Sequence, residues 1–434
     1  MKTKIWISLT LLTGAACTLH AAPAAEGYVA HEWGTFTSVQ GAQGVQMEWN
    51  PFLQWDLPEF VYDRNQNNPK KAGQRVAELA LKNSLGGRQR METPVIYFYS
   101  DIEQTVDVEV QFPQGLMTEW YPAATSFGPF NTTNAAEKAR SLENYLQWNQ
   151  VRILHPEAQS IAPQPGIPPS DQTDNHYYAA RETSANLLEI AGPRNAPGME
   201  HEKFLFYRGL GHFEAPLLTT TTADSKSLRI ENRGTDALTG LTIVRIQNGH
   251  GFFLTSASLQ PGAHQTFKLE TPTLPVGDLR RAVRDDMQDH LVGAGLYPDE
   301  ALAMVNTWND SWFGEEGLRV LYLLPQTWTD QMLPITLNPK PEQLVRVMVG
   351  RAEVITPTME WELLKQVVRF SDTDEAGRTA AVEAVRALKL GRFAEPTARR
   401  ILGETPAPSF HGAAWTLLQK AQLPLPVTPD LALK

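Results

Sequence analysis

Cysteine is almost absent from this sequence, where Cys17 is the only one among 434 residues. A chain with one cysteine can form neither an internal disulfide nor a metal site built from several thiolates. The fold must therefore be held together by its hydrophobic core. The composition, 42% hydrophobic and 20% charged residues, is ordinary for a globular protein, and the length is sufficient for two or three domains.

Recognised catalytic motifs are also missing. The sequence contains no HExxH, no GxSxG, no glycine-rich phosphate loop and no calcium loop of the EF-hand type. Their absence excludes the easily recognised metalloproteases, serine hydrolases and nucleotide-dependent enzymes. The sequence shows no solenoid repeat either, so a function must be inferred from individual residues.

Positive charge and long apolar runs are both sparse. The 38 Lys and Arg residues are outnumbered by 48 Asp and Glu residues, for a net charge of −10. An acidic chain without basic clusters is a poor candidate for binding nucleic acid, so we expect no such partner. No segment after the N-terminus approaches the roughly 18 uninterrupted apolar residues of a membrane-spanning helix, and we expect none.

The first 25 residues have the pattern of a secretory signal peptide. Lys2 and Lys4 precede a short apolar stretch at residues 5–17, and small residues suited to cleavage follow around 21–25. We therefore expect a periplasmic or secreted protein. The alternative is a lipoprotein anchored through Cys17, which we favour less because Gly14 stands where such sites usually carry a branched apolar residue.

Alternating patterns typical of strands dominate up to residue 275. Residues 93–99 predict a buried strand and residues 106–112 a half-exposed one, joined by a turn as a hairpin. Further strands are expected at 176–190 and 200–207, and four short ones between 228 and 270. A hairpin is stable only when a second sheet covers it. Residues 26–275 thus predict an antiparallel β-sandwich with a loop and helix insertion around 126–200.

After residue 276 the apolar period changes to about 3.6. One helical stripe contains Leu279, Val283, Met287 and Leu291, and a second runs from Ala301 to Trp312. Residues 318–324 predict a buried extended segment, and several short helices follow position 357. The expected fold class is α+β and multidomain, with the sandwich followed by a mainly α-helical region at 276–434.

Four segments resemble a family of secreted bacterial proteins. They are HEWGTFT at 31–37, METPVIYFY at 91–99, KFLFYRGLG at 203–211 and SWFGEEGLRVLY at 311–322. The resemblance runs from the start of the expected mature chain to about residue 350. It implies a secreted protein with a β-sandwich module, and it implies no function, because none is assigned to the family.

Pairs of histidine and glutamate near expected strand ends are the first candidate site. Imidazole and carboxylate groups suit zinc or a similar divalent ion, and together they can act as acid and base. Adjacent residues on a strand point to opposite faces, however, so the two groups of one pair converge only at a bulge or strand end. The competing interpretation is hydrogen bonding to loops at the sandwich rim. The catalytic candidates here are His31, Glu32, His201 and Glu202, and the metal candidates are His31, His201 and His212.

A second candidate group combines His176, Arg181 and Glu182 with Arg208. Arginine presents a planar fork that matches a carboxylate, so Arg181 or Arg208 could bind an acidic substrate while His176 acts as base. The alternative is an internal Arg–Glu pair that ties a strand to a loop.

Aromatic and acidic residues supply the remaining candidates. Trp120 and Tyr121 follow the expected hairpin, where exposed rings could stack on a sugar or else close the edge of the core. Glu315 and Glu316 could be paired carboxylates for glycosidic chemistry or a solvated loop. The leading hypothesis is a non-enzymatic binding protein for a polysaccharide or another envelope component, and the alternative is a metal-dependent or acid–base hydrolase.

Overall fold

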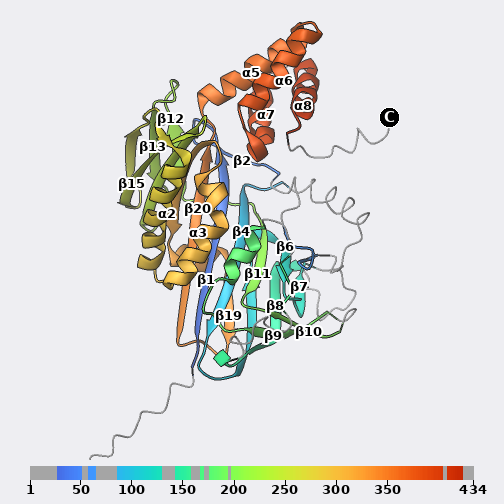
Figure 1. Cartoon of the computed structure of the whole chain (residues 1–434), viewed down its shortest axis with the longest axis vertical. Coiled ribbons are helices and arrows are strands. Elements are labelled where there is room, and N and C mark those ends of the chain that lie inside the picture. Colours follow the sequence, from blue (N-terminus) through green and yellow to red (C-terminus); the bar gives the residue numbers. More distant parts are fainter. Residues whose placement is uncertain are drawn as a thin grey trace, which may run out of the picture.

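An 11-stranded sheet forms the centre of the molecule in a computed structural model (Figure 1). The model describes residues 27–50, 57–64, 86–129, 142–157, 167–170, 175–193, 197–403 and 408–423, so the expected signal peptide and Cys17 lie outside the described residues. In spatial order the strands are β17 (Leu274–Pro275), β15 (His250–Leu259), β14 (Leu238–Gln247), β18 (Gly317–Leu324), β20 (Gln343–Val354), β1 (Val29–Gln40), β4 (Gln89–Tyr99), β11 (Leu205–Gly211), β6 (Gly115–Tyr121) and β3 (Tyr62–Asp63), with β2 (Gln46–Met47) paired to β1.

The two central strands, β1 and β20, are separated by about 300 residues in the sequence. They pair in parallel over twelve residues, from Val29 opposite Gln343 to Gln40 opposite Val354, whereas the other pairs in this sheet are antiparallel. Eleven of the twelve residues of β1 are buried, as expected for a strand covered on both faces. The central sheet is therefore complete only with residues 317–354, which supply β18 and β20.

A second sheet covers one face of the central sheet. Its strands, in spatial order, are β10 (Met199–Glu202), β9 (Leu188–Ala191), β8 (Tyr145–Ile153), β5 (Gln104–Gln111) and β19 (Ile335–Asn338), with β7 (Ser126–Gly128) paired to β8. Val106, Val108 and Val110 of β5 are buried and alternate with half-exposed polar residues. The two sheets share one hydrophobic core, in which the ring of Trp148 lies 6.5 Å from that of Tyr207.

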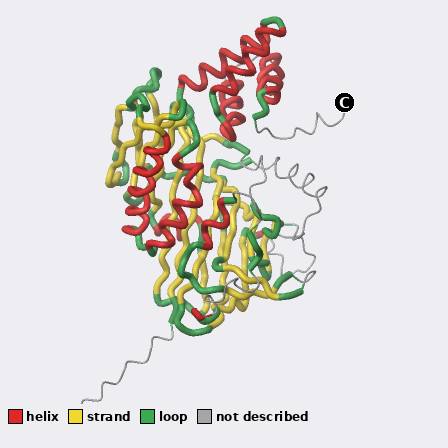
Figure 2. Tube along the Cα trace, viewed as in Figure 1, coloured by secondary structure: helices red, strands yellow, loops and turns green. Residues whose placement is uncertain are grey.

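Helices cover the opposite face. They are η3 (His176–Arg181), α2 (Val276–Gly293) and α3 (Pro298–Phe313), which Figure 2 shows in front of the strands. Leu279, Val283, Met287 and Leu291 of α2 are all buried, and Trp308 and Trp312 of α3 are buried as well. Both predicted helical stripes are confirmed. A short helix, α4 (Gln326–Met332), follows β18.

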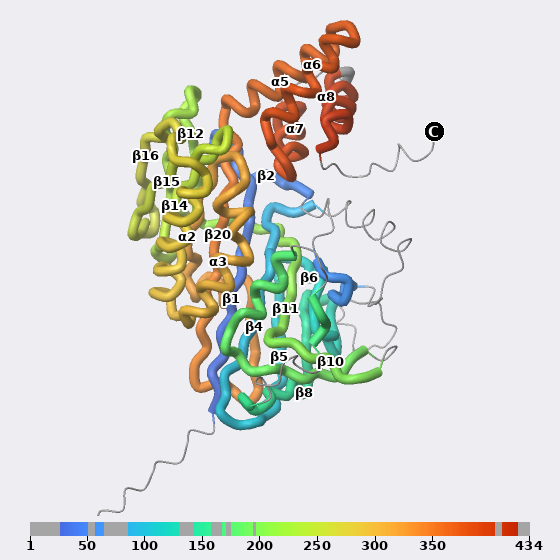
Figure 3. The backbone as a smooth tube through the Cα atoms, viewed as in Figure 1, coloured from blue at the N-terminus to red at the C-terminus, as the bar shows by residue number. Residues whose placement is uncertain are grey.

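Two smaller units complete the fold. A three-stranded sheet contains β12 (Leu217–Thr221), β13 (Ser227–Asn232) and β16 (His264–Lys268). The chain then ends in a helical unit formed by α5 (Pro357–Asp372), α6 (Glu375–Ala387), η4 (Gly391–Phe393), α7 (Ala394–Gly403) and α8 (Pro408–Lys420). This unit has its own hydrophobic core and extends beyond one end of the central sheet (Figure 3). Phe393 anchors it there by packing against Val39, Met47 and Trp49.

The coarse prediction, an α+β chain that is mostly sheet with helices mainly in its C-terminal part, is confirmed. The predicted hairpin is wrong, because β4 pairs with β1 and β11 while β5 pairs with β8 and β19 in the other sheet. Residues 176–181 form η3, and of the strand expected at 176–190 only the last three residues belong to a strand, β9. The expected boundary at 275–276 falls inside the central sheet, because β18 and β20 follow it.

Candidate functional site

His31 and Glu32 lie back to back on β1 and face different layers. Nδ1 of His31 is 2.7 Å from a carboxylate oxygen of Glu300 on the helix side. Glu32 faces the second sheet, where Nε of Arg346 lies 2.6 Å from its carboxylate and the Tyr207 hydroxyl also donates to it. All of these side chains are buried. The alternation of a strand therefore separates this predicted pair, as the geometry of adjacent strand residues requires.

Arg181 and Glu202 form an internal ion pair. Nη2 of Arg181 lies 2.7 Å from the Glu202 carboxylate, and Nε lies 3.1 Å from each of its oxygens. Burial alone would lower the pKa of Arg181, but the Glu202 carboxylate outweighs it and raises that pKa. The guanidinium also lies over the rings of Tyr177 and Tyr178, at 5.6 and 5.1 Å from their centroids. This pair ties η3 to the strand region around Glu202.

Two further predicted residues each contact a glutamate on a neighbouring strand. His201 of β10 lies opposite Glu189 of β9, with its Nε2 3.0 Å from the carboxylate. Arg208 of β11 lies opposite Glu119 of β6, with Nε 2.8 Å from the carboxylate and both side chains nearly inaccessible. Each of these groups has a partner inside its own sheet, which is how a structural cross-strand pair is arranged.

The remaining sequence candidates lie apart from one another. The ring of His176 is 5.3 Å from that of Trp308, and Glu182 ends η3. His212 is exposed just beyond β11. Trp120 and Tyr121 are 0% and 2% exposed, so these two rings belong to the core, as in the second interpretation given above, and they form no contact surface.

The three metal candidates do not converge. His31 lies on β1 in the central sheet, His201 lies on β10 in the second sheet and His212 follows β11. Within the described ranges, no group of three or more His, Cys, Asp or Glu side chains is placed to hold a metal ion. Among the described helices, none combines the length and apolar character that crossing a bilayer requires.

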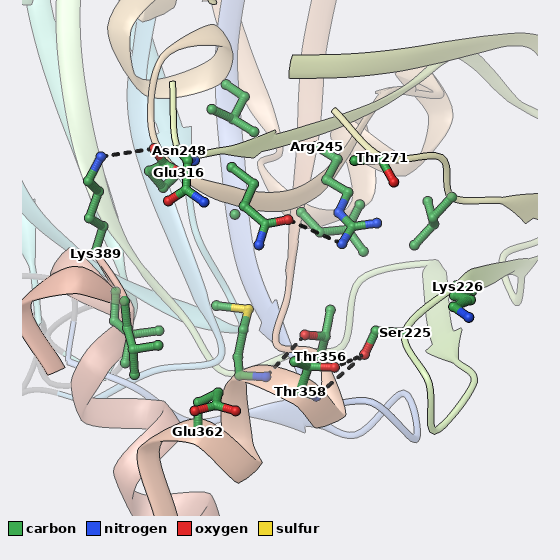
Figure 4. Close-up of a pocket in the computed structure, with 18 of the residues that line it drawn as sticks. Ser225, Lys226, Arg245, Asn248, Thr271, Glu316, Thr356, Thr358, Glu362 and Lys389 are labelled. Atoms are coloured by element: carbon green, nitrogen blue, oxygen red, sulfur yellow. Dashed lines mark hydrogen bonds and ion pairs between the residues drawn. The ribbon is translucent and has the colours of Figure 1, made fainter. Parts of the chain in front are cut away.

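A cavity of about 650 Å³ lies elsewhere, where the central sheet, the three-stranded sheet and the helical unit meet (Figure 4). Strands β14 and β20 end here, and β18 begins here. The sheet side of the lining consists of residues 224–226, 245–248, 268–271, 316–318 and Glu353, and the helix side consists of Thr356, Thr358, Met359, Glu362, residues 387–390 and Phe393. Its size is that of typical small-molecule sites.

Hydrogen bonds fix the two walls of the cavity relative to one another. Glu316 accepts from the backbone N–H groups of Asn248 and Gly249 at 2.8 and 3.1 Å, and Nζ of Lys389 lies 3.0 Å from its carboxylate. On the other side, the hydroxyls of Ser225 and Thr358 are 2.8 Å apart. These contacts join residues more than 60 positions apart in the chain and connect the sheet side of the cavity to its helix side.

An ionic cluster lies directly behind this wall. Arg319 and Arg351 both bind the Glu353 carboxylate, with Nε–Oε2 distances of 3.1 and 3.2 Å, and Nη2 of Arg351 lies 2.6 Å from Glu315. Burial would raise the pKa of Glu315, but Arg351 and its neighbouring arginines outweigh it and lower that pKa to about 2. Glu315 is thus engaged in structure, whereas Glu316 lines the cavity.

Arg245 is one of the lining residues that the sequence does not single out. It lies at the end of β14 and is half-buried, and burial lowers the pKa of its guanidinium. Its hydrogen bonds are long, 3.4 Å to the carbonyl oxygen of Glu270 and 3.5 Å to the side-chain oxygen of Gln247. The strand itself was predictable from LTIVRIQ, but the sequence carries no signal that its end adjoins residues near 360 and 390.

Comparisons with known proteins add no family. Neither a family model nor a curated protein matches the chain. Among solved structures, the mu homology domain of Fcho1 from Danio rerio, with a bound Eps15 peptide, aligns at 6% identity and a TM-score of 0.30, over 76% of this chain and 97% of that chain. The yeast delta-COP-I mu-homology domain, alone and with a Dsl1 WxWxV peptide, aligns at 8% identity and a TM-score of 0.27, over 77% and 98% of the two chains. Similarity this low establishes neither a common fold nor a common function.

Proposed function

We propose that this chain is a secreted or periplasmic binding protein for a polysaccharide or another envelope component, and that its ligand occupies the cavity between the sheets and the helical unit. One observation supports this proposal above the others. The cavity of about 650 Å³ is built from several structural units and lined by polar and apolar groups, which is the arrangement of a ligand site. The predicted catalytic residues His31, Glu32, Glu202 and Arg208 lie in internal pairs instead.

The proposed scaffold is a β-sandwich with the central sheet and the second sheet as its two layers, and it differs from the antiparallel sandwich expected from the sequence in the parallel pair of β1 and β20. The helical unit then forms one wall of the site, and the central sheet and the three-stranded sheet form the other. The resemblance to secreted bacterial proteins supports the proposed location. The alternative function, a hydrolase that uses the histidine–glutamate pairs, stays a prediction, and no contact described above favours it.

The proposal is tested by filling the cavity. Thr271 is exposed on its rim, so Thr271→Trp would occupy the opening without disturbing the core. The matched control is Thr235→Trp, at an exposed threonine that does not line the cavity. Isothermal titration calorimetry with trigalacturonic acid and its fully methyl-esterified form would measure binding. We expect at least one trimer to bind the wild type and the control, and the Thr271→Trp variant to lose most of that affinity. Equal affinity in all three proteins, or no binding to the wild type, would contradict the proposal.

A further inference from the structure

We propose that the ligand of this cavity carries a carboxylate and that Arg245 binds it, so that the ligand class is an acidic saccharide. This inference rests on the proposed function, since it assigns the chemistry of the same site. The inference is based on two observations. No described carboxylate lies within ion-pair distance of the Arg245 guanidinium, unlike the buried arginines around it, and the other lining groups suit a sugar ring.

Arg245 is a half-buried cation without a counter-charge. No carboxylate among the described residues lies within ion-pair distance of its guanidinium, and its two hydrogen bonds go to neutral oxygens at 3.4 and 3.5 Å. Arg319, Arg346 and Arg351, by contrast, each lie 3.2 Å or less from a glutamate oxygen. A guanidinium removed from water gains most from a bidentate carboxylate partner. The position of Arg245 on the cavity wall leaves that partner to be supplied by a ligand.

The acidic side chains that line the cavity do not contact the Arg245 guanidinium. Glu353 binds Arg319 and Arg351, and Glu316 accepts two backbone N–H groups and faces Lys389. Glu362 lies 2.8 Å from Lys365, and Asp224 accepts from the Thr222 hydroxyl and the Lys226 N–H. Glu270 is exposed, and its contact with Arg245 is through the backbone carbonyl. These acids therefore do not neutralise Arg245 directly.

Two lysines, together with Arg245, outnumber the two acids of this wall, Asp224 and Glu270. Lys226 and Lys268 both line the cavity and are exposed, on the neighbouring strand regions of β13 and β16. Figure 4 shows Arg245 and Lys226 on the same side of the cavity, away from the Glu316–Lys389 pair. A ligand would therefore find its most favourable place for a carboxylate next to Arg245, with Lys226 at longer range.

The rest of the lining matches the two surfaces of a sugar ring. Hydroxyl and amide groups of Asn248, Thr271 and Thr358 can bond to ring hydroxyls, and Met359, Leu390 and Phe393 offer an apolar surface for the C–H face. A uronic acid unit combines the hydroxyls, the apolar face and the carboxylate that this lining can bind. This composition is what selects an acidic saccharide over a simple inorganic anion.

The decisive measurement compares trigalacturonic acid with its methyl ester by calorimetry on four proteins. Arg245→Gln removes the charge, Arg245→Lys keeps the charge but loses the fork, and Arg369→Gln removes an exposed arginine that does not line the cavity. We expect the wild type to bind the acid about 10- to 100-fold more tightly than the ester. Arg245→Gln should abolish that preference, Arg245→Lys should retain part of it, and Arg369→Gln should bind like the wild type.

The outcomes separate the inference from the proposed function. If acid and ester bind equally to the wild type, in a manner that Thr271→Trp abolishes, the site is real and the acidic ligand is wrong. An acid preference that survives in Arg245→Gln likewise contradicts the role of Arg245. If neither trimer binds at about 10 mM, a concentration that detects even weak sites, both the proposed function and the inference are contradicted. Thermal unfolding of each variant would confirm that it is folded.

Discussion

Replacing Glu32 by glutamine should destabilise the protein strongly, because the carboxylate is one half of a buried ion pair. Glu32 and Arg346 have fully buried side chains, and Nε of Arg346 lies 2.6 Å from the carboxylate. In the wild type, burial would lower the pKa of Arg346, but Glu32 outweighs it and raises that pKa. The guanidinium stays charged in the variant because arginine does not lose its proton in proteins, so a buried charge is left without Glu32. Removing one partner of such a pair typically costs roughly 3–5 kcal/mol. Since Asp330 remains 2.8 Å from Arg346 with a half-exposed side chain, we expect about 3 kcal/mol.

Urea unfolding at pH 7, followed by circular dichroism, would measure this loss for Glu32→Gln, Arg346→Met and the double variant. The double variant should be more stable than the sum of the single losses predicts, by about 2 kcal/mol, because the second replacement removes the charge left unpaired by the first. Glu383→Gln in the exposed pair with Arg386 serves as the control and should not change the unfolding midpoint. Single losses that simply add would refute the reasoning. A Glu32→Gln protein as stable as the wild type would return Glu32 to the candidates for catalysis.

Two further predictions concern the helix side of the central sheet. The pKa of Glu315 is about 2 and its ordinary value is 4.5, so its pair with Arg351 contributes stability that is complete above pH 4.5 and is lost as the pH falls toward 2. Because the Glu315 side chain is 40% exposed, solvent screening leaves about 1–2 kcal/mol, which acid titration of the unfolding free energy should show in the wild type and not in Glu315→Gln. Phe393→Ala removes the buried ring that anchors the helical unit against Val39 and Trp49 and should cost about 3 kcal/mol. Limited proteolysis should then cut faster between β20 and α5, and an unchanged rate would show that this ring does not anchor the unit.

The local elements of this fold were predictable because periodicity reports which face of an element is buried. The alternation of Val106, Val108 and Val110 gave a half-exposed strand, and the stripe from Leu279 to Leu291 gave a buried helix face. Both patterns depend only on residues close in the chain. Tertiary packing agrees with them, so the prediction and the structure coincide.

Strand pairing was less predictable because it depends on residues far apart. The turn after β4 is compatible with a hairpin, yet β4 is buried on both faces, whereas β5 is buried on one. A strand covered on both faces belongs in the centre of a layered sheet, and a half-exposed one belongs in an outer layer. That difference was visible in the sequence and argued against the hairpin. The parallel partner of β1, which begins more than 300 residues later at Gln343, had no comparable signal.

The candidate site residues were likewise predictable in their local geometry but not in their distant partners. That His31 and Glu32 face opposite sides followed from strand geometry alone, and the internal Arg–Glu alternative for Arg181 describes its contact with Glu202. Their actual partners, Glu300 and Arg346, come from segments about 300 positions away, and sequence spacing does not indicate them. The cavity is harder still to foresee, because its walls meet only after the helical unit has docked.

Besides the cavity itself, the difference between Arg245 and the arginines paired with glutamate supports a ligand site. Hydrophobic packing alone would place no arginine in these positions, so each buried guanidinium requires a compensating group. For Arg208, Arg346 and Arg351 the chain supplies a glutamate at hydrogen-bond distance. For Arg245 it supplies only long contacts to neutral oxygens, at a point where the wall is open to a ligand. The chain pairs these other arginines but leaves Arg245 half-buried and without a counter-charge among the described residues. A carboxylate of a ligand explains this difference. The affinity of Arg245→Gln for the acidic trimer tests the explanation.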